Sequence, residues 1–390
     1  MIFAEPELEG IDHQVLELIR EQRVRLGRMT TSYPRRWMGS LRRNTFAKAI
    51  QGSNSIEGYN ATLDDAVAAI EEEPPLDERT ETWFAIKGYR DAMTYIMQTA
   101  SDDYFEFSKQ FLKSLHFMMV GFDLSANPGQ WRPGAVYVVN RASGRSVYEG
   151  PDAEIVDQLI NELVAYLKSP PAQSTIVKAA MAHLNLTLIR PFSDGNGRMA
   201  RALQTLMLSS EGFINPVFSS IEEWLGRNTE EYYATLATVG RGSWQPKNDA
   251  LPWVRFCLRA HYQQAGTVLR RYDEYESLYG MIEGIIEKRE LHERMAAPLF
   301  DCALGLRMTN SRYQSDVDVS GYIAGRDLKI LADKELIIPH GERRGRYYVA
   351  GEDLRNARKA ARRHKESLDP YELIKKKSSP EVAEPRLPGL

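Results

Sequence analysis

Apolar and polar positions follow a helical period along most of the chain up to about residue 270. Residues three or four apart share one face of a helix, so this pattern predicts helices with one buried side. The clearest runs are VLELIREQRVRL, TFAKAIQ, TLDDAVAAIEEE, WFAIKGYRDAMTYIMQ and FSKQFLKSLHFMM. Prolines and glycines break the pattern at residues 73–75, 170–171 and 240–252. We expect residues 251–290 to form one or two long helices that leave the core, and the chain to be mainly α-helical.

Two stretches depart from the helical period. Residues 135–139 are rich in strand formers, and residues 146–148 return after a turn at Ser143-Gly144, which predicts a β-hairpin. Further on, an amphipathic helix around Leu328 precedes two short strands that flank residues 341–345. The C-terminal part is therefore predicted to be a small α+β unit.

The segment HLNLTLIRPFSDGNGRMAR, residues 183–201, has the features of an anion-binding site. A helix leads into it, Pro191 ends that helix, and a second helix starts after residues 194–197. Glycines let backbone amides converge, and the start of a helix adds unpaired N–H groups and partial positive charge. Arg198 and Arg201 share one side of the second helix, and Asp194 is a candidate ligand of a divalent cation that bridges phosphates. The alternative is a plain Asn-Gly turn, but a hairpin needs strands on both sides and both flanks here favour helix.

This segment resembles the Fic family motif HPFx(D/E)GNGRxxR. Its matching residues are Pro191, Phe192, Asp194, Gly195, Asn196, Gly197, Arg198 and Arg201. The resemblance implies an all-helical core with a hairpin flap, and adenylyl transfer from ATP to a protein hydroxyl. It also implies that Asp194 holds Mg²⁺ and that Gly195, Asn196, Gly197, Arg198 and Arg201 bind the phosphates of ATP or another nucleotide.

The sequence departs from the motif at the position of its general base, where Arg190 replaces the histidine. A guanidinium has a pKa above ~12 and no free lone pair, so it cannot accept the proton. General-base help contributes roughly 10² to 10⁴ in rate. Arg190 is left with two equally supported roles, a phosphate contact or an ion pair that supports the loop. His183 and His116 are interpreted as structural residues rather than as substitutes for the base.

The stretch SNSIEGYN, residues 53–60, is similar to the inhibitory motif (S/T)xxxE(G/N) of the same family, with Ser53, Glu57 and Gly58 in the defined positions. The resemblance implies that Glu57 pairs with Arg201 and prevents productive seating of the γ-phosphate. The alternative is a solvated acid at a helix end.

Two further regions are interpreted through the resemblance. Pro128, Gly129 and Arg132 match the PGxxR opening of a flap that docks a target peptide on a strand edge, the alternative being a plain surface hairpin. After the motif, the family places an asparagine and tyrosines near the adenine. The candidates here are Asn228, Tyr232 and Tyr233, although aromatic residues at helical spacing are more often core.

The C-terminal α+β unit resembles a winged helix-turn-helix domain with GERRGRYY as its wing. Arg343, Arg344 and Arg346 are the candidate contacts to DNA phosphates. The alternative is a module that docks a protein or a second copy of the chain, with its charges simply solvated.

Composition adds few constraints. The chain has 390 residues, 43% hydrophobic and 26% charged, with a net charge of -3 that does not indicate a general nucleic-acid or membrane binder. Two cysteines without pairing or metal spacing, no apolar run long enough for a membrane and an acidic start without a signal-peptide pattern favour a cytoplasmic protein. The expected divisions are a helical region with the inhibitory-type helix (1–100), the Fic core (101–265), a connecting helix with the winged-helix domain (266–352) and a basic, flexible tail (353–390).

Three functions remain open. The first is a catalytically impaired Fic protein that binds a nucleotide and acts as a regulator or interaction protein, which Arg190 favours. The second is an enzyme of altered chemistry, such as removal of AMP from a modified target. The third is ordinary adenylyl transfer supported by positioning alone.

Overall fold

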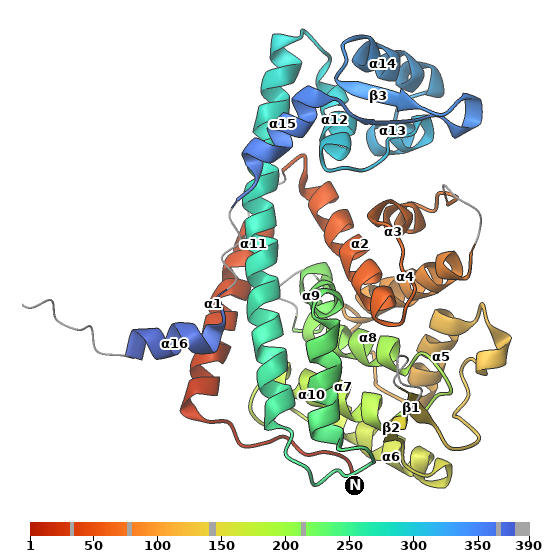
Figure 1. Ribbon diagram of the computed structural model, residues 1–390, viewed down its shortest axis with the longest axis vertical. Helices are drawn as coiled ribbons and strands as arrows, with labels where there is room; N and C mark the ends of the chain where they lie inside the picture. The colour runs from red at the N-terminus through yellow and green to blue at the C-terminus, as the bar shows by residue number, and fades with distance from the viewer. Residues whose placement is uncertain (32–34, 76–79, 140–145, 212–215, 364–367, 379–390) are drawn as a thin grey trace, which may run out of the picture.

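The computed structural model describes most of the chain, in the ranges 1–31, 35–75, 80–139, 146–211, 216–363 and 368–378. The molecule is elongated, with a helical core at one end and a smaller C-terminal module at the other (Figure 1). Among the described residues, no helix combines the length and apolar character that a membrane span requires.

Among the described residues, ten α-helices precede the long helix that joins the two ends. They are α1 (Gly10–Thr31), α2 (Met38–Ile56), α3 (Leu63–Ile70), α4 (Glu81–Thr99), α5 (Lys109–Val120), α6 (Ala153–Lys168), α7 (Thr175–Ile189), α8 (Asn196–Ser209), α9 (Glu222–Arg227) and α10 (Thr229–Gly240). Short 3₁₀ turns lie at Leu124–Ala126 and Pro216–Phe218. Strands β1 (Tyr137–Val139) and β2 (Ser146–Glu149) form the predicted antiparallel hairpin, in which Val138 faces Tyr148. Its expected turn at residues 143–144 lies outside the described residues.

The core is built around α7, which is buried along almost its whole length. The helical period predicts one buried side for this helix, but α7 is buried on all sides, and polar residues such as Asn185 are fully buried as well. The Asn185 side chain accepts from the backbone N–H of Phe3 and donates to the Phe3 carbonyl. The extended N-terminal residues therefore supply the polar partners that let α7 lie at the centre.

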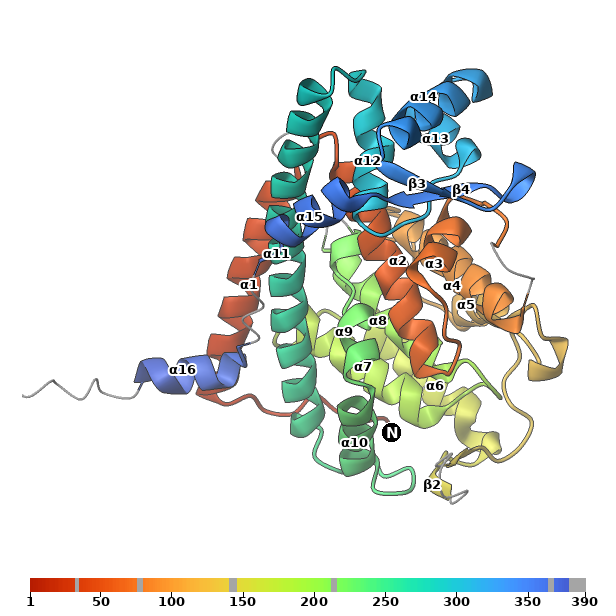
Figure 2. The same cartoon turned by 45° about the horizontal axis from the view of Figure 1, so that its top comes forward.

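A single helix, α11 (Leu251–Lys288), connects the two ends of the molecule. Trp253 and Phe256, near its start, belong to the apolar cluster of the core. Val268 and Ile282, further along, belong to a second cluster in the C-terminal module. The helix thus packs in the core before it leaves it. Figure 2 shows α11 running beside both parts.

The C-terminal module comprises residues 293–361. Its elements are α12 (Ala296–Ala303), α13 (Asn310–Val317), α14 (Gly321–Asp333), β3 (Ile337–His340), β4 (Tyr347–Ala350) and α15 (Glu352–Ala361), with 3₁₀ turns at Glu293–Met295 and Arg343–Gly345. Strands β3 and β4 are antiparallel, and Met308 adds a short bridge to Tyr348 of β4. The predicted order of helix, two short strands and intervening glycine-rich turn is confirmed.

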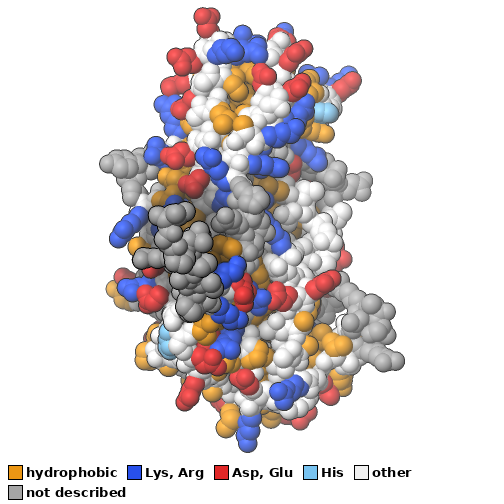
Figure 3. Space-filling model, turned by 60° about the vertical axis from the view of Figure 1, so that its left-hand side comes forward, with side chains coloured by type: hydrophobic (Ala, Val, Ile, Leu, Met, Phe, Trp, Pro, Cys, Tyr) orange, Lys and Arg blue, Asp and Glu red, His pale blue; other side chains and the backbone are white. Residues whose placement is uncertain are grey.

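The expectation of a flexible tail over 353–390 is wrong for its described part. Leu354 and Ala361 of α15 are buried in the module's apolar cluster. Beyond them, α16 (Pro370–Ser378) packs on α1. Ile374 of α16 is buried there, and the Tyr371 hydroxyl donates to Asp12 Oδ1 at a distance of 3.0 Å. Apolar residues spaced along a charged stretch anchor both helices. Figure 3 shows that basic and acidic side chains are mixed on the face that carries this region.

Candidate functional site

The loop between α7 and α8 is fixed from within by its own backbone and by Asn196. Arg190 ends α7 in the left-handed conformation, with φ of 47°. Gly195 is also left-handed, with φ of 73°, and precedes the first residue of α8. The Asn196 side chain accepts from the Phe192 N–H at 3.0 Å and donates to the Phe192 carbonyl at 2.8 Å. The loop therefore closes on itself and presents the start of α8, whose first N–H groups have no helical partner.

Arg132 supports this loop from outside. Its backbone N–H donates to the Pro191 carbonyl at 2.9 Å, and its Nε donates to the Arg190 carbonyl at 2.8 Å. Its terminal nitrogens donate to the carbonyls of Gly134 and Pro151. One buried side chain thus joins the loop to both ends of the hairpin.

His116 provides the second support. Its Nδ1 accepts from the Gly129 N–H at 2.9 Å, so its Nε2 carries the proton and donates to the Asp194 carbonyl at 3.0 Å. The ring stacks on Phe192 with 3.7 Å between centroids. Burial lowers the pKa of His116 to about 4, so the ring is neutral and is fully used in structural contacts.

A cavity of about 610 Å³ opens over the loop. Five parts of the fold enclose it: the end of α2, the hairpin β1–β2, the end of α7, the loop with the start of α8, and α10. The side chains that line it include Ile56, Glu57, Tyr148, Thr187, Arg190, Asp194, Tyr232, Tyr233 and Leu236. One part of the lining is therefore charged and another part is apolar and aromatic.

Arg190 lines the cavity, and Arg198 and Arg201 are buried in the first two turns of α8. Arg198 is 1% exposed and donates one hydrogen bond, to Asp194 Oδ2 at 3.1 Å. Its Nε and Nη1, and the Nε of Arg190, are buried donors without a partner among the described residues. Buried donors that stay unsatisfied are costly, so the arrangement favours an anionic ligand that would accept from them.

Glu57 occupies part of this cationic site. It follows the last residue of α2, and the next residue, Gly58, has the left-handed φ of 92° that a helix end accommodates. Arg201 Nη2 donates to Glu57 Oε1 at 2.7 Å, while Arg201 Nε donates to Ser53 Oγ at 2.8 Å. Burial raises the pKa of the Glu57 carboxyl, but Arg201, Arg198 and Arg190 together outweigh burial and hold it below its usual value. Ser53, Glu57 and Arg201 are thus brought together at the start of α8.

The three candidates from the α9–α10 region differ in position. Tyr232 is buried, and its ring and that of Tyr233 line the cavity. The Tyr233 hydroxyl donates to the Ile56 carbonyl at 3.2 Å. Asn228 lies between α9 and α10, where its side chain donates to the Trp224 carbonyl, and it does not line the cavity.

A buried polar chain extends behind Tyr232. The Tyr232 hydroxyl lies 3.0 Å from His183 Nε2, and His183 Nδ1 lies 2.6 Å from Gln204 Oε1. Gln204 Nε2 lies 3.0 Å from His261 Nε2. Burial lowers the pKa of both His183 and His261 to about 3, so both rings are neutral.

Asp194 is the only carboxylate of the loop, and its side chain is 57% exposed. No group of three or more potential metal ligands occurs within the described ranges. Mg²⁺ usually keeps several waters and needs one or two carboxylates together with phosphate oxygens. The site fits Mg²⁺ only as part of a complex with a phosphate ligand.

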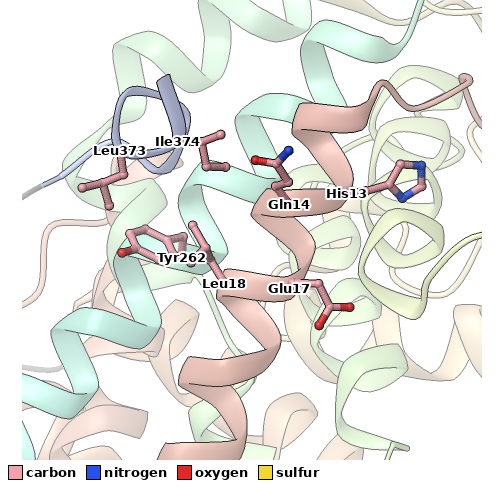
Figure 4. A pocket seen from close by; sticks show the side chains of 7 residues that line it. All are labelled: His13, Gln14, Glu17, Leu18, Tyr262, Leu373 and Ile374. Carbon is pink, nitrogen blue, oxygen red and sulfur yellow. The ribbon is translucent and has the colours of Figure 1, made fainter. Parts of the chain in front are cut away.

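The candidates in the C-terminal module lie apart from this cavity. Arg343 and Arg346 are exposed at the tip between β3 and β4, while the side chain of Arg344 lies outside what the structure describes. A second cavity of about 410 Å³ lies between α1, α11 and α16. Figure 4 shows Leu18, Tyr262 and Ile374 around it. It lacks a buried charged side chain among its described lining residues, so the larger cavity is the candidate site.

Sequence reasoning missed several side chains of the site, among them Tyr59 and Tyr148. The Tyr59 ring lies 5.3 Å from the Arg198 guanidinium carbon, and Tyr148 of β2 donates its hydroxyl to the Leu188 carbonyl at 2.8 Å. Tyr59 stands two residues after Glu57, so the stretch that pointed to Glu57 also contained this signal. Tyr148 had no signal beyond its strand propensity.

Residues 106–208 match the family model described as Fic/DOC family. The matched segment contains the hairpin, α7, the loop and all but the last residue of α8.

Among curated proteins, the chain is 26% identical to "Protein adenylyltransferase Fic" of Nematostella vectensis, over 65% of this chain and 55% of that protein. It is 27% identical to "Protein adenylyltransferase fic-1" of Caenorhabditis elegans, over 64% of this chain and 46% of that protein. The aligned part thus spans about half the length of these relatives.

Solved structures show the same fold. A Fic family protein from Desulfovibrio desulfuricans superposes with a TM-score of 0.57 at 20% identity, over 89% of this chain and 98% of that chain. Fic-1 from C. elegans gives a TM-score of 0.51 at 24% identity, over 66% and 72% of the two chains. At these identities the likeness concerns the fold alone, and the mainly α-helical Fic fold with small hairpins is confirmed.

Proposed function

We propose that this protein binds ATP or a related nucleotide in the large cavity and acts as a regulator or interaction protein whose adenylyl transfer is impaired. The observation that carries this proposal is the buried Arg198 guanidinium with unsatisfied donors beside the start of α8. The relatives named as protein adenylyltransferases support ATP as the ligand.

In this proposal the charged part of the cavity lining binds the phosphates and the apolar part holds the base. The backbone of Gly195, Asn196 and Gly197, with Arg198 and Arg201, takes the phosphates, because helix starts and guanidinium groups both favour anions. Tyr232, Tyr233, Ile56 and Leu236 offer the base an apolar surface. Asn228 is the weakest of the proposed contacts because its side chain is bonded to the Trp224 carbonyl. Asp194 would hold Mg²⁺ together with the phosphates.

Arg190 stands where a general base would be needed and cannot serve as one. Its side chain lines the cavity, and its charge contributes to the low pKa of Glu57. We assign it to phosphate binding when a ligand is present and to holding Glu57 when it is not.

An active enzyme is the second candidate. Asp194, Asn196, Arg198 and Arg201 keep the full set of phosphate-binding groups, and the hairpin could dock a protein target along strand β1. Such an enzyme would transfer AMP by positioning alone, or would remove AMP from a modified target.

Transfer of label from ATP labelled at the α-phosphate distinguishes the impaired regulator from the active enzyme. Wild type, Arg190→His, Glu57→Gly and the double variant are incubated with Mg²⁺ and cell lysate. The first proposal expects labelled protein only when Arg190→His is present, most strongly together with Glu57→Gly. Transfer by wild type, or by Glu57→Gly alone, would show that Arg190 does not abolish the chemistry and would favour the second candidate.

DNA binding by the C-terminal module is a separate candidate function, in which the module is a winged helix. Tyr322, Arg326 and Lys329 lie on one exposed face of α14, with Tyr322 80% exposed. Arg343 and Arg346 are exposed as well, at the tip of the β3–β4 hairpin. A gel-retardation assay with random duplex DNA tests it, and Arg343→Ala with Arg344→Ala should weaken binding. Protein or self-association remains the alternative if no retardation occurs at low salt.

A further inference from the structure

Helix α2 belongs to both ends of the molecule. Near its start, Met38 and Leu41 pack in the apolar cluster of the C-terminal module. Near its end, Ile50 and Ile56 pack in the core cluster. Figures 1 and 2 both show α2 running from α12 and α13 toward α8. A helix of this length is a stiff connection of about 28 Å between the module and the cavity.

The start of α2 is fixed to the module through Arg43. This largely buried guanidinium pairs with Asp301 of α12, with Asp316 of α13 at 3.2 Å and with Glu71 after α3 at 3.5 Å. Burial raises the pKa of Asp316 to about 6, against the opposing effect of Arg43. Arg43 is therefore the shared counter-ion of carboxylates from three elements.

The neighbouring helix α3 is fixed to the same module. Arg312 of α13 pairs with Glu73 at 2.6 Å and with Asp64 at 3.7 Å. The backbone N–H of Arg307 donates to Asp64 Oδ1 at 2.9 Å. These contacts and those of Arg43 form one ion cluster that joins the module to α2 and α3.

The far end of α2 cannot shift without changing the cavity. A Cβ on Gly52 would collide with the backbone of Glu222, and a Cβ on Gly226 would collide with the backbone of Gly52. Ser53 and Glu57 hold Arg201 at 2.8 Å and 2.7 Å, and Ile56 accepts from Tyr233. A displacement at the start of α2 is thus transmitted to Glu57, the carboxylate that pairs with Arg201.

We infer that the C-terminal module, through the ion cluster, holds Glu57 against Arg201 and so lowers the affinity of the cavity for ATP. This rests on the proposed function, in which the cavity binds ATP. A partner that draws the module away from α2 and α3 would raise the affinity for ATP. By linkage, ATP would weaken the docking of the module by the same factor.

The test is a double-mutant cycle on ATP affinity, measured by equilibrium dialysis with labelled ATP and Mg²⁺. Arg43→Ala should tighten ATP binding by about fivefold or more, the lower range of typical coupling. On the Glu57→Gly background, Arg43→Ala should have no further effect on ATP affinity, because the Glu57 carboxylate that it would release is already absent. An equal change in both backgrounds, or no change in either, would overturn the inference.

Arg42→Ala is the matched control, because Arg42 is exposed on the same helix and lies beside Arg43. Asp316→Asn is a milder variant in case Arg43→Ala does not fold, and should act in the same direction. Hydrogen exchange over residues 53–58 provides a readout without ligand and should speed up in Arg43→Ala but not in Arg42→Ala. If even Glu57→Gly fails to bind ATP, the proposed function is wrong. Unchanged exchange over residues 53–58 in Arg43→Ala would then also reject the coupling.

Discussion

At residue 190 the backbone and the side chain have separate roles in the site. The backbone must be left-handed to end α7, and its carbonyl accepts from Arg132. The side chain lines the cavity. Pro191 made the end of the helix predictable, but not the sign of φ, because an arginine in that conformation gives no signal in the sequence.

Substitutions at residue 190 should separate these requirements. Arg190→Gly is expected to be more stable than Arg190→Ala by about 1 kcal/mol, because glycine adopts a positive φ without steric cost. Urea unfolding of the two variants measures the difference. Equal stability, or a more stable Arg190→Ala, would mean that the loop does not impose this conformation.

A side chain at residue 197 would test the position of the Glu57 carboxylate. A Cβ on Gly197 would collide with Glu57 Oε1, which is the movable end of a flexible side chain. Gly197→Ala should therefore displace the carboxylate from Arg201 and destabilise the protein by about 1–2 kcal/mol. In the Glu57→Gly background the loss should fall below about 0.5 kcal/mol, since alanine is the better helix former. Thermal unfolding of the four proteins provides the comparison, and an undiminished loss would locate the collision elsewhere.

At the scale of elements, the helices and the two hairpins follow from periodicity and turn residues, and most of them were predicted. What the sequence could not supply is how elements from different parts of the chain hold each other. The PGxxR stretch is an example, since nothing in it indicates that Arg132 reaches the carbonyls of Arg190 and Pro151. The cavity depends on such contacts, so its charged loop was predictable and its enclosure was not.

Arg132→Lys tests the importance of this fork-shaped side chain for the hairpin. A lysine cannot satisfy three carbonyls in different directions, so a loss of about 2–3 kcal/mol is expected. The Gly150 N–H donates to the Val136 carbonyl at 3.0 Å, and its hydrogen exchange should become faster. The amides of α6 serve as the internal reference. Protection of Gly150 equal to that in wild type would show that the hairpin is held without Arg132.

At the scale of the whole molecule, buried neutral histidines make stability depend on pH. Burial lowers the pKa of His116 to about 4 and that of His183 and His261 to about 3, from 6.5. Below pH ~6.5 the unfolded chain binds protons that the folded protein does not. Stability is thus complete above that pH and falls as the pH drops toward 4. Each histidine contributes about 1.4 kcal/mol per pH unit to that slope.

His261→Gln should reduce the slope of stability against pH by about 1.4 kcal/mol per pH unit, the contribution of one histidine. Glutamine can still accept a hydrogen bond from Gln204 but does not titrate. Urea unfolding at pH 6.0, 5.5 and 5.0 measures the slope in both proteins. His13→Gln is the control, since His13 is exposed on α1. An unchanged slope in His261→Gln would show that His261 takes up its proton in the folded protein as readily as in the unfolded chain.

The continuity of α11 sets a condition on how the two ends of the molecule are oriented. Each residue of an α-helix adds about 1.5 Å and turns the chain by about 100°. One residue inserted near Gly266, between the two apolar clusters, would rotate the whole C-terminal module by that angle and separate Asp301 and Asp316 from Arg43. Seven residues would nearly restore the angle but move the module about 10 Å along the axis. The number of residues in α11 therefore sets both the rotation of the C-terminal module about the helix axis and its distance from the core. This helix should tolerate substitutions far better than insertions or deletions.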